Sequence, residues 1–244
     1  MASFDDALAA VSGVEGWMTD DQAWRLFERA RALRPPGRIV EIGSYRGRSA
    51  IVLASAAAEG VEVVAIDPHA GNDRGPQQIA GSDSEGEADH RAFNDNLARA
   101  GVEGRVRHVR LPSQQAFGAT DGPVELLYVD GAHRYAPARA DIERWGERVL
   151  PGGTLLIHDS FSSVGVTLAI LRLLATADDW RYIGRTGSLA EYRRTPLSGA
   201  ERARNAARQL AELPWFARNL AIKVLLLARL RPLARRLGSD EWPY

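Results

Sequence analysis

Residues 37–49, Gly-Arg-Ile-Val-Glu-Ile-Gly-Ser-Tyr-Arg-Gly-Arg-Ser, contain the pattern that decides the fold. A short apolar run carries one acid, Glu41, and ends at Gly43, and a segment of helical composition begins at Gly47. A strand, a glycine turn and a helix in that order bring backbone N–H groups close to a ligand. The spacing E-x-G-x-x-x-G differs from the G-x-G-x-x-G of dinucleotide folds, and a carboxylate at the strand end would repel a pyrophosphate. The turn therefore favours a cationic or amino-acid-like ligand.

Strand-like and helix-like segments alternate along the rest of the chain. Apolar runs predict strands at 38–42, 61–66, 106–111, 124–129 and 154–158, and helical periodicity predicts helices at 19–33, 47–59, 86–100, 136–149 and 163–177. Residues 180–193 predict two short strands about a Gly187-Ser188 turn. The fold class is therefore α/β: a Rossmann-like doubly wound sheet, mostly parallel with a C-terminal antiparallel hairpin, plus N- and C-terminal helices.

Three segments follow from this order. Residues 1–36 form an N-terminal helical segment, 37–195 a ligand-binding domain, and 196–244 a basic, apolar helical extension. Within the domain, residues 69–89 are rich in Gly, Ser and Asp and predict a long loop or lid. His69, Asp73 and His90 flank this segment or lie within it and are expected as solvated side chains, with contact to a substrate as the alternative.

Composition narrows the class of protein. The 244 residues include no cysteine, which excludes disulfides, thiol nucleophiles and thiolate metal sites. No signal peptide and no long apolar run are visible, so a cytoplasmic protein is expected. The net charge is zero, but residues 198–238 hold nine basic and two acidic side chains. An acidic body with a basic tail argues against nucleic-acid binding by the main domain.

Acids stand at four predicted strand ends: Glu41, Asp67, Asp130 and Asp159. In a doubly wound sheet, ligands bind beyond the carboxyl ends of the strands. One such acid is common by chance, but four on the same edge predict a ligand site there.

The motifs around these acids resemble those of the class I S-adenosylmethionine (SAM)-dependent methyltransferases, in particular the small-molecule O-methyltransferases of family 24. The resemblance covers roughly residues 14–193. It rests on Glu41-Ile-Gly43-Ser44-Tyr45-Arg-Gly47-Arg-Ser49, Val63-Val-Ala-Ile-Asp67, Leu127-Tyr-Val-Asp130-Gly131-Ala-His133-Arg-Tyr135 and Leu150-Pro-Gly152-Gly153-Thr-Leu-Leu-Ile-His158-Asp159.

The resemblance implies O-methylation of a small molecule such as a sugar, a polyketide, another secondary metabolite or a glycolipid. It also implies that SAM contacts residues of the first two motifs and of the strand ends beyond them. The implied cofactor-binding residues are Glu41, Gly43, Ser44, Tyr45, Gly47, Ser49, Asp67, Ser113 and Asp130. Asp67 is placed to accept two hydrogen bonds from ribose hydroxyls.

Relatives that need a metal bind a divalent cation through acids at the fourth and fifth strand ends, which here are Asp130 and Asp159. Mg²⁺ suits such oxygen ligands. Ser160 stands where those relatives often have Asn as a third ligand, and both acids are equally explained as turn and helix caps. His133, Asp130 and His158 are the catalytic candidates, with His133 the leading general base.

The C-terminal stretch 213–237 combines apolar residues with arginine. Three interpretations remain open: a helix docked on the domain or on a second copy in a homodimer, a helix on a membrane surface, or a basic contact for an acidic partner. Two other functions also remain, a non-catalytic partner protein that kept the fold and a nicotinamide-dependent oxidoreductase. The missing G-x-G-x-x-G argues against the latter.

Overall fold

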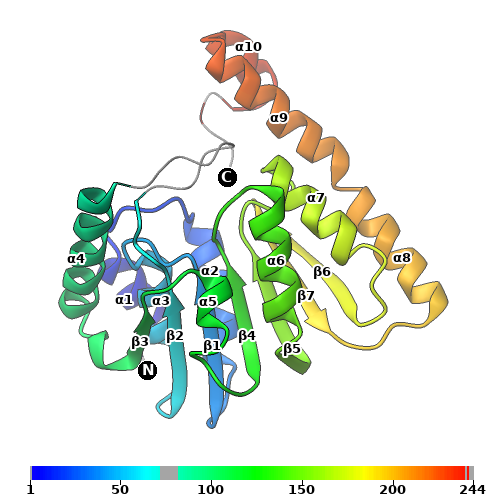
Figure 1. The fold of residues 1–244 in the computed structure, drawn as a ribbon. Coiled ribbons are helices and arrows are strands. Elements are labelled where there is room, and N and C mark those ends of the chain that lie inside the picture. Colours follow the sequence, from blue (N-terminus) through cyan, green and yellow to red (C-terminus); the bar gives the residue numbers. More distant parts are fainter. Residues whose placement is uncertain (1, 72–81, 240, 242–244) are drawn as a thin grey trace.

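The computed structural model of the protein describes residues 2–71, 82–239 and 241, and it contains one seven-stranded sheet in the order β3-β2-β1-β4-β5-β7-β6 (Figure 1). The strands are β1 (Gly37–Ile42), β2 (Val61–Ile66), β3 (Val106–Val109), β4 (Val124–Val129), β5 (Val149–Ile157), β6 (Trp180–Thr186) and β7 (Leu189–Arg194). All neighbours pair in parallel except β5 with β7 and β6 with β7. The predicted doubly wound sheet with a C-terminal antiparallel hairpin is confirmed.

Helices cover both faces of the sheet. They are α1 (Phe4–Ala10), α2 (Asp20–Arg31), α3 (Arg48–Ala56), α4 (Asp83–Arg99), the short 3₁₀ helix η1 (Glu103–Arg105), α5 (Ser113–Ala116), α6 (Tyr135–Gly146), α7 (Val164–Leu173), α8 (Gly199–Leu210), α9 (Leu213–Leu227) and α10 (Arg231–Arg236). Helices α1, α2, α3 and α4 pack on one face of the sheet through a hydrophobic core that contains Ile39 and Val63. Helices α5, α6 and α7 pack on the opposite face of the sheet through a second core that contains Val40 and Val64. This alternation along each strand places Glu41 on the α3 face.

Several element boundaries differ from the prediction. Helix α1 was not predicted, and it begins with a capping box in which Ser3 and Asp6 satisfy each other's backbone N–H groups. Helix α4 corresponds to the helix predicted at 86–100 but begins three residues earlier, at Asp83, so the predicted loop 69–89 is wrong from that residue onward. The part of the loop at 72–81, which contains Asp73, lies outside the described residues.

The basic, apolar tail forms three helices that follow one another along one side of the molecule, and α9 and α10 extend past the end of α7 (Figure 1). The stretch 213–237 is not one helix, because α9 ends at Leu227 and Arg229 takes a left-handed φ of 59° before α10 begins. Helix α9 packs on the body through the buried residues Asn219 and Ile222. No helix in the described part of the chain is long and apolar enough to cross a membrane.

Candidate active site

The turn after β1 is built on two glycines with φ of +87°, Gly43 and Gly47. A Cβ added to Gly43 would lie 2.2 Å from the carbonyl oxygen of Asp130, so only glycine fits where β1 meets the end of β4. Between the glycines, Tyr45 also takes a left-handed φ of 45°. This conformation costs a non-glycine residue free energy, and such strain is concentrated at functional sites.

Glu41 is completely buried beneath this turn, where Ser49 of α3 donates a hydrogen bond to its Oε1. Its second oxygen, Oε2, has no hydrogen-bond partner in the described structure. Burial raises the pKa of Glu41 to about 8, although the hydroxyls of Ser49 and Ser44 oppose the shift. A buried carboxyl oxygen without a partner can accept a hydrogen bond from a cationic group, and the cofactor-binding role of Glu41 stays a prediction.

The unusual pKa of Glu41 makes stability depend on pH. The folded state keeps the proton up to about pH 8, whereas the unfolded chain releases it near pH 4.5. Because the folded state binds more protons across this window, the free energy of unfolding falls as the pH rises through it. Glu41→Gln is expected to remove this slope and to be a few kcal/mol more stable than the wild type at about pH 8. Urea denaturation at several pH values checks this, and an unchanged slope would contradict the assignment.

Asp67 follows β2, and its carboxylate contacts the backbone of two turns, the glycine turn after β1 and the turn after β2. The backbone N–H of Tyr45 donates to Oδ2 and that of His69 donates to Oδ1, each at 2.8 Å. These two bonds fix the side chain, while each oxygen keeps a second lone pair for a ligand hydroxyl. The structure therefore brings Asp67 to the first motif, as its predicted ribose-binding role requires.

The ends of β4 and β5 bring Asp130, His133, His158 and Asp159 into one cluster. His133 Nε2 lies 3.0 Å from Asp159 Oδ2, and His158 Nδ1 lies 3.2 Å from Asp130 Oδ1. Although burial opposes these shifts, each histidine holds the pKa of both carboxyls below its usual range, and the carboxylates raise the pKa of His133 to about 9. The same pairs raise the pKa of His158 to about 10 against the effect of its burial. In this cluster the protonated form of both histidines and the ionised form of both carboxyls are therefore favoured.

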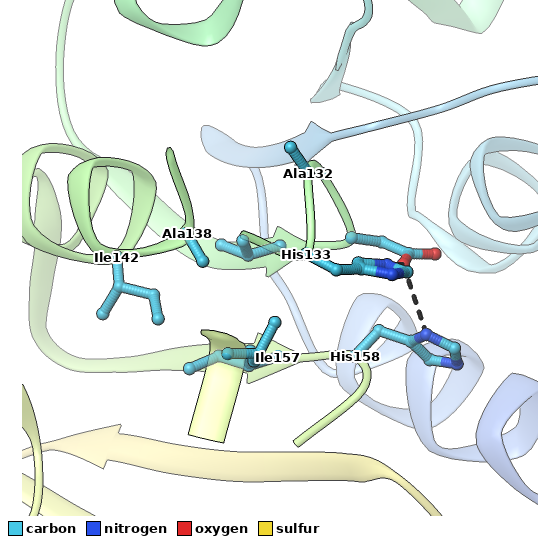
Figure 2. Close-up of a pocket in the computed structure, with 10 residues that line it drawn as sticks. Ala132, His133, Ala138, Ile142, Ile157 and His158 are labelled. Atoms are coloured by element: carbon cyan, nitrogen blue, oxygen red, sulfur yellow. Dashed lines mark ion pairs between the residues drawn. The ribbon is translucent and has the colours of Figure 1, made fainter. Parts of the chain in front are cut away.

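The two histidines differ in their access to a ligand. Figure 2 shows both at one end of a small pocket, with Ile142 and Ile157 toward the other end. His158 is 4% exposed, and its Nε2 lies 3.3 Å from the Gln22 side chain of α2, so it positions Asp130 from behind. His133 keeps a quarter of its side chain exposed. Of the two, His133 is the one that can touch an acceptor.

The loop after β5 is held in a strained form. Asp159 and Phe161 take left-handed φ values of 54° and 53°, and both side chains are buried. Ser160 stands where metal-dependent relatives often have a third ligand. Its side chain is fully buried and donates to the carbonyl oxygen of Ile157 at 2.8 Å, so it is engaged away from any metal. Lys223 of α9 donates to the carbonyl oxygen of Ser162 at 2.9 Å, which fixes the loop from the C-terminal side.

Ser113 is the predicted site residue that the structure assigns to other partners. Its hydroxyl donates to Asp141 of α6, and its carbonyl oxygen accepts from the indole nitrogen of Trp145 at 3.3 Å. Burial raises the pKa of Asp141 to about 6 despite this hydrogen bond. These contacts join α5 to α6.

Sequence reasoning missed several residues of this region. Trp17 lies beside Tyr45 with ring centroids 5.6 Å apart, at the mouth of the first turn. Gln22 and Lys223, which support the acid–histidine cluster, lie far from the motifs in sequence. His69 and His90, expected as solvated loop residues, instead gather with His108 next to Asp67: His69 is 5% exposed and His90 belongs to α4.

Comparisons with known proteins agree with this geometry. A family model described as a methyltransferase domain, Methyltransf_24, matches residues 40–160. A curated relative, uncharacterized protein y4gI of Sinorhizobium fredii (strain NBRC 101917 / NGR234), is 35% identical over 136 residues. The match covers 53% of this chain but only 14% of that relative, so the chain spans a small part of its length.

Several solved structures share the fold at low sequence identity. Cofactor-bound Rv0187 from MTB is 20% identical with a TM-score of 0.59, over 80% of this chain and 89% of that one. The O-methyltransferase TomG from Streptomyces achromogenes, in complex with SAM, is 19% identical with a TM-score of 0.56, over 79% and 89%. An O-methyltransferase from Bacillus cereus with bound SAH (S-adenosylhomocysteine) is 18% identical with a TM-score of 0.57, over 79% and 90%. Together with the motif residues now seen on one sheet edge, the family match shows that the chain carries a methyltransferase domain of family 24 over residues 40–160.

Proposed function

We propose that the protein is a SAM-dependent O-methyltransferase that acts on a small molecule. The observation that carries the proposal is the carboxylate of Asp67, fixed by the backbone of the first glycine turn, beside the buried Glu41. A carboxylate so fixed suits ribose hydroxyls, and a buried acid suits the ammonium of an amino-acid moiety. SAM carries both groups. The SAM- and SAH-bound proteins of the same fold support this choice.

Each part of the site has a role in such a transfer. Gly43 and Gly47 let the backbone approach the cofactor, with Ser44, Tyr45 and Ser49 between and beside them. When bound, SAM supplies an electrophilic methyl group on sulfur. The acceptor oxygen must lie in line with that group and give up its proton. The acid–histidine cluster at the ends of β4 and β5 is where we place the acceptor hydroxyl.

The cluster also fits a divalent cation. One ligand atom each from Asp130, His133 and Asp159 lies within 4.8 Å of the others. His133 thus supplies the third donor that Ser160 does not. Two carboxylates and an imidazole accommodate Mg²⁺ or Mn²⁺, and such an ion would lower the pKa of an acceptor hydroxyl. Without a cation, the raised pKa of His133 makes it a proton donor at neutral pH, so its role as the base requires that the proton on it leave first.

Calorimetric titration tests the proposal. SAH is expected to bind the full chain with one site per molecule, while NAD⁺ and NADP⁺ are expected to give no heat of binding. Methyl transfer from labelled SAM into small-molecule extracts, with and without Mg²⁺, then separates an enzyme from a partner protein that only kept the pocket. No SAH binding would overturn the proposal, and binding without transfer to any acceptor would favour the partner protein.

We further propose that α9 and α10 lie on an anionic membrane surface. Leu220, Val224 and Leu227 form one exposed stripe on α9, and Leu230, Leu233 and Leu237 are exposed after the end of that helix. Arg229, Arg231, Arg235 and Arg236 are exposed in the same region. Apolar side chains flanked by arginine are typical of helices at lipid interfaces.

Liposome flotation tests this contact with the full chain. Wild-type protein is expected to float with vesicles that contain phosphatidylserine, and Leu227→Asp is expected to abolish flotation. Leu210→Asp, at another exposed leucine that lies on α8, is the control and should float as the wild type does. If Leu227→Asp floats normally, or light scattering shows that it converts a dimer to a monomer, the stripe is not a membrane contact.

A further inference from the structure

Three histidines gather on the α4 face of the sheet, outside the acid–histidine cluster described above. His69 follows β2, His108 lies on β3, and His90 lies on α4. One ring nitrogen from each lies within 4.8 Å of the others. The ring centroids are 5.3 Å apart for His69 and His90, 5.0 Å for His69 and His108, and 5.3 Å for His90 and His108.

These spacings match those of a three-histidine metal site. A zinc–nitrogen bond of about 2.0–2.1 Å and tetrahedral angles place the ring centroids of three histidine ligands about 5 Å apart. Stacked rings would instead be parallel, whereas the His69 and His108 planes are inclined by 63°. The other two pairs are inclined by 42° and 33°, so none of the three pairs is a parallel stack.

Backbone carbonyls beside the outer nitrogens prepare two of the three rings for a ligand. Nε2 of His69 donates to the carbonyl oxygen of Tyr45 at 2.6 Å, and Nε2 of His108 lies 3.3 Å from the carbonyl oxygen of Asp67. Nδ1 of His69 is buried and has no hydrogen-bond partner in the described structure. A backbone carbonyl that accepts from one nitrogen fixes the tautomer and leaves a lone pair on the other, which is the usual arrangement behind a metal-bound histidine.

Helix α4 is held against this site by a close backbone contact. A Cβ added to Gly86 would lie 2.1 Å from the carbonyl oxygen of His69, so a side chain there would push the helix away. His90 follows Gly86 by four residues and therefore lies on the same face of the helix. The Asn94 amide contacts Nε2 of His90 at 3.2 Å, and Phe93 packs against the His108 ring with centroids 4.6 Å apart.

We propose that His69, His90 and His108 bind a divalent transition-metal ion of the zinc class, with water in the fourth position. Three imidazoles favour Zn²⁺ or Co²⁺ and disfavour Mg²⁺, which prefers oxygen ligands. The ion would join the end of β2, β3 and α4, where Arg110 after β3 already pairs with Glu87 of α4. Because the backbone N–H of His69 donates to Asp67, the ion also fixes the turn that orients this carboxylate. The site stands independently of the function proposed for the chain.

Cobalt absorbance tests the site in untagged, metal-free, full-length protein. One equivalent of Co²⁺ is expected to give the intense visible absorbance of tetrahedral coordination, and one equivalent of Zn²⁺ is expected to bleach it. His90→Ala is expected to lose this absorbance, and alanine is well tolerated in a helix, so the variant should fold. Arg91→Ala, an exposed neighbour on α4, is the matched control and should keep it.

A second variant separates this site from the acid–histidine cluster. Asp159→Asn removes a candidate ligand there and is expected to leave the cobalt absorbance unchanged. Absence of tetrahedral absorbance in the wild type, its retention in His90→Ala, or its loss in Asp159→Asn would each overturn the proposal. His108→Ala serves as a second test of the site and is expected to behave as His90→Ala does.

Discussion

Alanine at position 43 is expected to lower the free energy of unfolding by about 3–5 kcal/mol and to abolish SAH binding. Gly43 has a φ of +87°, which strains any residue with a Cβ. The added Cβ would also lie 2.2 Å from the carbonyl oxygen of Asp130 and 2.9 Å from Cα of Gly131. Both obstacles are backbone atoms, so β1 and β4 must separate where the site is built. Urea denaturation and SAH calorimetry measure the two effects.

The control for Gly43→Ala is Gly104→Ala. Gly104 lies in η1, its added Cβ would meet nothing within 4 Å, and it has no left-handed φ. This variant should differ from the wild type by less than about 1 kcal/mol, because only the intrinsic preferences of glycine and alanine change. Equal effects of the two substitutions would mean that the contact between Gly43 and Asp130 is not the cause.

The topology could be predicted from sequence because it depends on local signals. Buried parallel strands are short apolar runs, and their carboxyl ends meet at one edge of the sheet by geometry alone. The four strand-end acids therefore indicated the edge before any contact was known. The structure adds their division into two groups: Glu41 and Asp67 surround the glycine turn, while Asp130 and Asp159 share two histidines.

The remaining features depend on tertiary contacts that no local pattern reports. The composition of 69–89 predicted a loop, but α4 starts at Asp83, and Gly86 within it makes a close backbone contact with His69. Similarly, the tail pattern did not show that α9 places Lys223 against the loop after β5, 61 residues away in sequence. Periodicity identifies a helix and its apolar face, but not the partner on which that face packs.

Asp67→Ala is expected to weaken SAH binding by about 100-fold or more. A hydrogen bond to a charged acceptor contributes about 1.5–3 kcal/mol, and two ribose hydroxyls would lose their acceptor together. The substitution also leaves the N–H groups of Tyr45 and His69 without the oxygens that they contact at 2.8 Å. The turn that approaches the cofactor would thus lose its anchor as well. Calorimetric titration with SAH gives the affinity, and thermal denaturation confirms that the variant is folded.

Asp95→Ala is the matched control, because Asp95 is an exposed carboxylate on α4. It removes the same charge and should bind SAH as the wild type does, which separates loss of the Asp67 contacts from a change in net charge. Equal affinity in Asp67→Ala and the wild type would remove Asp67 from the cofactor site. Since the fixed Asp67 carboxylate carries the proposed function, that result would count against SAM as the ligand, whereas a loss confined to Asp67→Ala would support a ligand that carries a ribose.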